Sequence, residues 1–261
     1  MGANASTSAP PTKVAGTRYY FAVITNSFNC TTTTTVSSAI LVNPLPTIST
    51  QPSISSQTKC LNEAFTALSV SATAGSGSIL KYEWYSNTTN STTGGTLVAT
   101  NTSSALTNSY TPLSSSAGVL YYYVIVYNTN GCQITSNISA PFTVNDIPSI
   151  SVQPSNTNQT ACLNTPTTDL TVNASAGSGN ISSYTWYSTS NISGTPVWTV
   201  VATNTTSSTT NTYTPASNNV GTLYYYVRVT NSNGCFRASS ASGSVTINPV
   251  AIITNQNDAY C

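Results

Sequence analysis

Apolar and polar residues alternate in short runs along this chain, and clusters of Gly, Asn, Ser and Pro separate the runs. Alternation with a period of two is typical of β-strands that bury one face. No segment carries a sustained helical period, so the sequence predicts an all-β fold. Between residues 46 and 147 the pattern predicts strands over 47–52, 64–72, 80–86, 96–100, 106–111, 119–128 and 134–144.

The same alternation separates expected core positions from expected surface positions. Trp84 and Tyr122 share the apolar parity of their strands, and Trp186 and Tyr225 hold the equivalent positions further along. We therefore expect these four rings in the core. The tyrosine two residues before a core valine is also typical of the tyrosine corner of immunoglobulin-like sandwiches.

The opposite parity is rich in aromatic residues, which we expect to face outward: Tyr85, Tyr121, Tyr123, Tyr187, Tyr224 and Tyr226. One interpretation is cross-strand packing that stiffens the sheet. The other is a surface that stacks on sugar rings or adheres to solids. Trp198 has no counterpart earlier in the chain, so it is either a recognition tip or a cover over the sheet edge.

Three stretches of the chain repeat one another: GTRYYFAVITNSFNC at 16–30, GVLYYYVIVYNTNGC at 118–132 and GTLYYYVRVTNSNGC at 221–235. Their first glycines lie 102 and 103 residues apart, which is close to the length of one immunoglobulin-like sandwich. The sequence thus predicts tandem immunoglobulin-like β-sandwich repeats arranged head to tail. The predicted domains are the C-terminal part of a preceding repeat, two full repeats and the start of a following repeat: 1–45, 46–147, 148–249 and 250–261.

Both ends of the chain fall inside a repeat, and the first residues lack the basic leader and apolar stretch of a signal peptide. We therefore expect an excerpt of a longer periodic protein. Hereafter the first repeat is 46–147 and the second repeat is 148–249.

Composition narrows the function classes. The chain is 39% hydrophobic and 4% charged, with a net charge of +1. Its 16 Tyr and 3 Trp favour packed cores over a disordered tract. The six basic residues are scattered, so nucleic acid is not an expected partner, and no apolar run reaches the length of a membrane span.

Candidate catalytic chemistry is sparse. The chain has no His and five acidic residues, and the acids do not recur from repeat to repeat: Glu83 corresponds to Thr185 and Glu63 to Thr165. General acid–base catalysis and metal binding both need titratable or ligating groups brought together. We therefore expect no catalytic site, no metal, no cofactor and no enzymatic activity.

The motif C-L-N … Y-x-W-Y … G-G-T-x-V-A-T … Y-T-P … L-Y-Y-Y-V-x-V-x-N-x-N-G-C runs through both full repeats. It resembles the immunoglobulin-like repeats of long proteins that Bacteroidota secrete by the type IX system, including cell-surface adhesins of gliding bacteria. The resemblance implies an extracellular, cell-surface stalk or filament that spaces and attaches. Its implied partners are neighbouring repeats, surface polysaccharide or abiotic surfaces. The alternative is a carbohydrate-binding accessory module of a secreted polysaccharide-degrading enzyme.

The cysteines recur with the repeats. Cys60 and Cys162 precede the second strand of a repeat, Cys132 and Cys235 follow the sixth, and Cys30 and Cys261 hold equivalent positions in the flanking parts. One arrangement bonds Cys60 to Cys132 and Cys162 to Cys235 within repeats. Those turns are expected at opposite ends of a sandwich, roughly 25 Å apart for eight residues of strand, whereas bonded Cα atoms lie within about 7 Å. The second arrangement bonds Cys60 to Cys235 between repeats, with Cys30, Cys132 and Cys162 pairing with units outside the sequence. In the third arrangement the cysteines remain free thiols.

Overall fold

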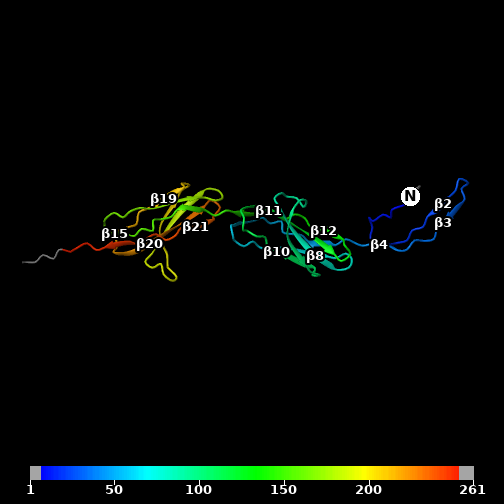
Figure 1. The fold of residues 1–261 in the computed structure, drawn as a ribbon, viewed down its shortest axis with the longest axis horizontal. Coiled ribbons are helices and arrows are strands. Elements are labelled where there is room, and N and C mark those ends of the chain that lie inside the picture. The colour runs from blue at the N-terminus through cyan, green and yellow to red at the C-terminus, as the bar shows by residue number, and fades with distance from the viewer. Residues whose placement is uncertain (1–6, 253–261) are drawn as a thin grey trace, which may run out of the picture. The chain divides into compact units, whose positions relative to one another are not determined.

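The structure is a computed structural model and describes residues 7–252. All secondary structure in these residues consists of β-strands, and the two full repeats fold as tandem immunoglobulin- or fibronectin-type sandwiches (Figure 1). The predicted all-β fold class is confirmed.

The sandwich of the first repeat has a smaller and a larger sheet. The smaller sheet has the strand order β10 (Thr107–Tyr110), β7 (Leu68–Thr73), β5 (Thr47–Thr50). The larger sheet has the strand order β6 (Gln57–Cys60), β13 (Phe142–Asn145), β11 (Gly118–Asn128), β8 (Ile79–Asn87), β9 (Thr96–Thr102). The short strand β12 (Gln133–Thr135) also pairs with β11.

The second repeat has the same topology. Its smaller sheet has the order β14 (Ser149–Val152), β16 (Leu170–Ser175), β19 (Thr210–Tyr213). Its larger sheet has the order β15 (Gln159–Cys162), β22 (Val245–Asn248), β20 (Gly221–Asn231), β17 (Ile181–Thr189), β18 (Thr199–Thr205). The short strand β21 (Phe236–Ala238) also pairs with β20.

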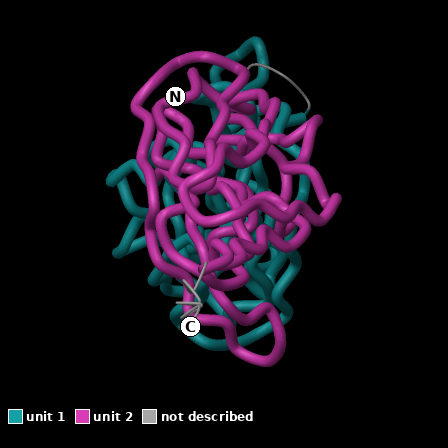
Figure 2. The backbone as a smooth tube through the Cα atoms, turned by 90° about the vertical axis from the view of Figure 1, so that its left-hand side faces the viewer, with its two compact units in different colours: residues 1–57, 65–113, 119–143 teal, residues 58–64, 114–118, 144–261 magenta. Residues whose placement is uncertain are grey.

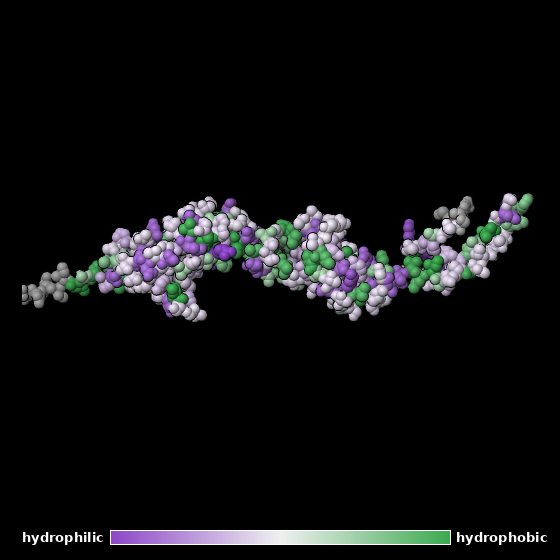
Figure 3. Space-filling model, viewed as in Figure 1, coloured by the Kyte–Doolittle hydropathy of each residue, from purple (hydrophilic) through white to green (hydrophobic). Residues whose placement is uncertain are grey.

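The N-terminal part forms two short antiparallel ladders, β1 (Gly16–Arg18) with β4 (Ile40–Val42) and β2 (Val23–Thr25) with β3 (Thr31–Thr33). These strands hold the sequence positions of β11, β12 and β13 one period earlier. No second sheet covers them within the described residues: Ile24 is 57% exposed, whereas the equivalent Val126 is fully buried. Figure 3 shows hydrophobic residues on this part of the surface.

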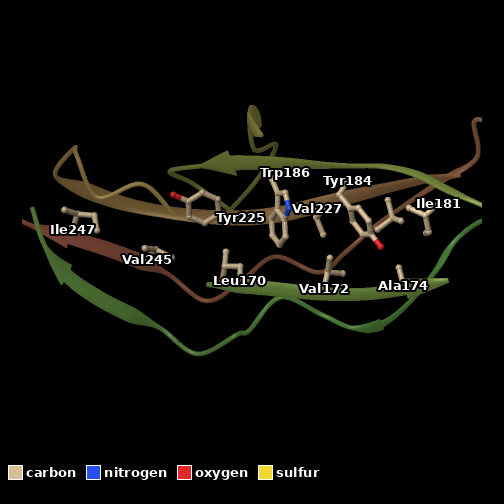
Figure 4. Close-up of a cluster of buried hydrophobic side chains, with 11 residues drawn as sticks. Leu170, Val172, Ala174, Ile181, Tyr184, Trp186, Tyr225, Val227, Val245 and Ile247 are labelled. Carbon is tan, nitrogen blue, oxygen red and sulfur yellow. The ribbon is translucent and has the colours of Figure 1, made fainter. Parts of the chain in front are cut away.

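The core of each sandwich lies between its two sheets. Trp84 and Trp186 are fully buried, and Tyr122 and Tyr225 are 2% exposed. Figure 4 shows the second repeat, where the side chains of both sheets meet around Trp186. Each indole N–H donates to an asparagine Oδ1 on the opposite sheet at 2.8 Å, Trp84 to Asn108 and Trp186 to Asn211. The polar edge of the ring is thus satisfied, which removes the cost of burying it.

Two strand predictions are wrong in detail. The predicted strand 64–72 begins at Leu68, and an additional strand, β6, precedes it; its counterpart β15 runs parallel to β22. The predicted strand 134–144 is interrupted between β12 and β13. There Ser136 and Ser139 place their hydroxyl oxygens where strand carbonyls would stand, and accept from Val124 N at 3.0 Å and Tyr122 N at 2.9 Å.

The same interruption recurs in the second repeat, where Ser239 accepts from Val227 N at 2.9 Å and Ser242 from Tyr225 N at 3.0 Å. Because the backbone amides of all four serines also donate to the same strand, the interrupted segment keeps β11 and β20 hydrogen-bonded without a regular strand. Sequence reasoning missed these serines, although their recurrence at a spacing of three was visible.

The described chain divides into two compact units (Figure 2). The first contains the residues up to Gln57, then Phe65–Leu113 and Val119–Thr143. The second contains everything from Val144 onward and also two short segments of the first repeat, Thr58–Ala64 and Ser114–Gly118. Two turns at one end of the first repeat therefore belong with the second repeat.

Candidate functional site

A disulfide joins Cys60 to Cys235, with Cα atoms 5.6 Å apart and a sequence separation of 175. Both cysteines lie in the second compact unit. Among the described residues Cys30, Cys132 and Cys162 are free. The alternative with bonds inside each repeat is therefore not the one in the structure, since both of its bonds would use Cys60 or Cys235. Cys261 lies outside the described residues.

Cys60 is presented at the end of β6 by a tight turn. Asn62 adopts a left-handed φ of 67°, a conformation that asparagine tolerates better than most residues. The amide of Glu63 donates to Cys60 O at 3.0 Å, and the carboxylate of Glu63 accepts from Cys60 N at 2.9 Å. The amides of Leu61 and Asn62 donate to Asn145 O and Ser114 O, both at 2.9 Å. Four hydrogen bonds thus fix the backbone around this sulfur.

Cys235 is presented by a turn built on a buried asparagine. Asn231 is 1% exposed, and its Oδ1 accepts from Cys235 N at 3.0 Å. Its Nδ2 donates to Ala176 O at 2.9 Å and to Asp146 O at 3.1 Å. One amide side chain therefore shapes the turn and also holds the segment that connects the repeats. The recurring N-x-N-G-C motif was the signal that could have identified this residue.

A glycine beside that connection is required for close approach. Gly177 has a φ of 71°, and a Cβ there would overlap the carbonyl oxygen of Ile147. Gly75 stands in the same relation to Leu45, one repeat earlier. These two recurring glycines thus mark close backbone contacts at each connection, where a side chain has no room.

The outward aromatic face of the first repeat is more enclosed than predicted. The rings of Tyr85 and Tyr123 stack at 5.1 Å with an interplanar angle of 6°. The prediction of an exposed Tyr123 is wrong: it is 3% exposed, because the turn at Gly95 lies against its ring and hydroxyl. Tyr85 and Tyr121 are half-buried.

A small polar cluster lies on the same face. Lys81 Nζ pairs with Glu83 Oε1 at 2.5 Å and sits 4.5 Å from the centre of the Tyr127 ring. The hydrogen bond from Lys81 holds the pKa of Glu83 below its ordinary value. Burial, followed by the hydrogen bond to Glu83, raises the pKa of Tyr127 to about 12. The phenol therefore stays protonated at neutral pH, and the cluster joins β8 to β11 through the contact of Lys81 with the Tyr127 ring.

The second repeat has a different outer face. Tyr187 and Tyr226 stack at 4.8 Å, and Trp198 meets Tyr226 edge-on at 4.6 Å. Arg228 lies over the ring of Phe236 at 5.1 Å. Trp198, Tyr187, Tyr224 and Tyr226 are all half-buried. Trp198 thus covers the sheet by packing on Tyr226, and the flat rings of this face contact one another.

The described residues contain no group of three or more His, Cys, Asp or Glu side chains that could hold a metal ion. Nor does any described segment form a helix that is long and apolar enough to cross a membrane. Glu63, an acidic residue that does not recur in the second repeat, supports the turn of Cys60.

Known proteins add a limited comparison. No protein-family model matches the chain, and no curated protein matches it. Solved structures similar to it include the fibronectin(III)-like modules of Clostridium thermocellum CbhA, with 16% identity, 82% of this chain and 100% of that chain covered, and a TM-score of 0.33. Titin domains A168–A170 share 14% identity, with 90% and 75% covered and a TM-score of 0.35. Because these identities and TM-scores are low, the fold class rests on the strand order of the chain itself.

Proposed function

We propose that this chain is part of a bacterial extracellular, cell-surface adhesin or filament in which its repeats act as a stalk spacer and contribute to surface attachment. The observation that supports this proposal most is the Cys60–Cys235 disulfide. Disulfides persist in oxidising compartments outside the cytoplasm. This one links residues of two successive sequence repeats, so it would carry tension between them.

The bond gives tension a short covalent route. A pull on the two ends of the chain would pass from Cys60 directly to Cys235. The residues between them comprise most of the strands of both sandwiches, from β7 to β20. Even if either sandwich unfolded, the intervening residues could not extend. We infer a stalk whose length is protected by a crosslink as well as by folding stability.

Single-molecule force spectroscopy tests this role. When the oxidised chain is pulled from its ends, we expect the extension to lack the contour between the two cysteines, whose sequence separation is 175, roughly 600 Å at ~3.4 Å per residue. Dithiothreitol should restore this length, and so should the double variant Cys60→Ser/Cys235→Ser without reductant. Full extension of the untreated oxidised chain would contradict the proposal.

The cellular side of the proposal needs its own test. Antibodies raised against residues 46–249 should label intact cells of the source bacterium, and mild protease treatment of those cells should remove the label. Labelling that requires permeabilised cells would refute the surface location.

A second candidate function is carbohydrate binding by the second repeat, because Trp198 and Arg228 make its outer face differ from that of the first. Against it, Trp198 packs edge-on against Tyr226 instead of presenting its face to solvent. Binding of the two-repeat chain to a glycan array would decide. Micromolar binding that is lost in Trp198→Ala but kept in the matched variant Tyr85→Ala would favour this second function.

A further inference from the structure

The outer face of the second repeat carries a basic side chain, Arg228 on β20, that no described acidic side chain neutralises. Within residues 7–252 the one ion pair is that of Lys81 with Glu83, in the first repeat. Arg237 donates through its Nε to Pro148 O at 2.8 Å, whereas the Nε of Arg228 is buried and has no hydrogen-bond partner. Nη1 and Nη2 of Arg228 are not among the buried atoms, so both reach solvent.

The strand register explains why this cation has no carboxylate beside it. In the antiparallel pair of β17 and β20, Arg228 lies opposite Thr185. At the equivalent place in the first repeat, Ile125 lies opposite Glu83. The first repeat therefore holds a carboxylate on this face, which Lys81 neutralises, whereas the second repeat holds a cation without a carboxylate.

Aromatic rings, rather than hydrogen-bond acceptors, hold the guanidinium in place. Its central carbon lies 5.1 Å from the centre of the Phe236 ring and 6.0 Å from the centre of the Tyr187 ring. Tyr187 is itself stacked on Tyr226 at 4.8 Å with an interplanar angle of 3°. Arg228 is half-buried by these contacts. Since partial removal of water strengthens the attraction between opposite charges, this guanidinium is positioned to bind an anion.

The groups around Arg228 favour a carboxylate that is carried on a sugar ring. Two adjacent N–H groups of a guanidinium can bind both oxygens of one carboxylate, and Nη1 and Nη2 are the pair that reaches solvent. Beside them Phe236 is 54% exposed, which leaves an apolar surface for the C–H face of a sugar.

The charge on this face is isolated. The other basic residue of the second repeat, Arg237, pairs in register with the core residue Val229, so it points to the opposite side of the sheet. One cation suits a polymer with one carboxylate per sugar, whereas the dense charge of a nucleic acid is bound by clustered cations.

We propose that Arg228 and Phe236 form a binding site for an acidic polysaccharide whose units are uronic acids. This inference rests on the surface attachment proposed above, and it names the surface chemistry to which the chain attaches. The guanidinium binds the carboxylate, and the phenylalanine ring contacts the sugar. The site does not need a free face of Trp198, which packs against Tyr226. The first repeat, whose outer charges are paired, has no such site.

Surface plasmon resonance of the full chain on immobilised polygalacturonate tests the proposal. In a buffer of low ionic strength the parent chain should bind this polymer and should not bind neutral dextran. Arg228→Gln should weaken the binding about tenfold, because it removes charge-assisted hydrogen bonds to the carboxylate. The matched control Lys13→Gln removes one positive charge from an exposed residue of the N-terminal part and should bind as the parent does.

A second variant keeps the arginine and supplies it with a partner. Thr185→Glu places a carboxylate opposite Arg228, as Glu83 stands opposite Ile125 in the first repeat. The new side chain should pair with the guanidinium and weaken polygalacturonate binding as much as Arg228→Gln does. Thermal melts of the variants verify that each is folded.

Equal weakening by Lys13→Gln would overturn the proposal, because it would indicate attraction to the net charge of the chain. Unchanged binding in Arg228→Gln would overturn it as well. Tighter binding to polyglutamate or to dextran sulfate than to polygalacturonate would assign the cation to a peptide or to a sulfate instead. The extension and cell-labelling experiments do not involve Arg228, so the stalk can be confirmed while this site fails, and the reverse also holds.

Discussion

In the first repeat Phe65 and Phe142 meet edge to face at 5.1 Å, and Phe142 also contacts Tyr122 at 5.3 Å. The second repeat has Thr167 and Val245 at the positions of these two phenylalanines. A cleft of about 200 Å³ lies beside Val245, and its lining includes Tyr213, Tyr225 and Ile247. The strand order is unchanged.

This difference separates what specifies the fold from what fills it. Both repeats keep the buried tryptophan, its asparagine partner and the recurring serines, and both adopt the same two sheets. The two phenylalanine rings can be absent without altering the topology. We conclude that the hydrogen-bonded core residues define the sandwich, whereas the rings at its end adjust its stability.

The largest expected effect tests what the repeats have in common. Trp84→Ala and Trp186→Ala should each destabilise their own repeat by about 3–5 kcal/mol, because each removes a fully buried ring and one of the two donors to the Oδ1 of Asn108 or Asn211. Hydrogen exchange measured by mass spectrometry would resolve each repeat separately. Costs that differ by more than about 2 kcal/mol would show that the two cores are not equivalent.

The next effect tests the difference. Phe142→Val should destabilise the first repeat by ~2 kcal/mol, because it removes most of a ring that is 1% exposed. Conversely, Val245→Phe should fill part of the cleft that Val245 lines and stabilise the second repeat by about 1 kcal/mol. Urea unfolding of the two variants beside the parent chain measures both changes. Destabilisation by Val245→Phe would mean that the second repeat has packed around its smaller residue.

The smallest effect concerns the outer faces. Since the folded-state pKa of Glu83 lies below its ordinary value of 4.5, its contribution is present above that value and is lost as the pH falls through the lowered pKa. The first repeat should therefore lose less than about 1 kcal/mol on acidification that the second repeat, with Thr185 at this position, keeps. In Glu83→Gln this difference between the repeats should disappear from thermal melts recorded at pH 3 and pH 6. Its persistence in that variant would assign it to another group.

Much of this fold could be predicted from the sequence because its determinants are local and repeated. Period-two alternation marked the strands around Trp84 and Trp186, and all four predicted core aromatics are buried. The interruption at Ser136 could not be predicted in this way, since it depends on hydroxyl groups that replace backbone carbonyls of the ladder. Parity placed Tyr123 on the correct side of its strand but could not predict its burial, because the turn at Gly95 covers the ring.

The candidate site was less accessible from sequence. Strand lengths alone argued against bonds within a repeat, but they left three arrangements of the cysteines open. The choice depends on the turns that orient the sulfurs, and these turns are set by Asn62 and Asn231, which alternation does not distinguish from surface residues.

One consequence follows from the single ion pair, Lys81 with Glu83, that the described residues contain. Dissolved ions weaken attractions between exposed charges over a distance that falls from about 10 Å at 0.1 M to about 3 Å at 1 M. A surface covered by threonine, serine and asparagine offers those ions almost nothing to screen. The sandwiches should therefore keep nearly the same melting temperature in dilute buffer and in brine.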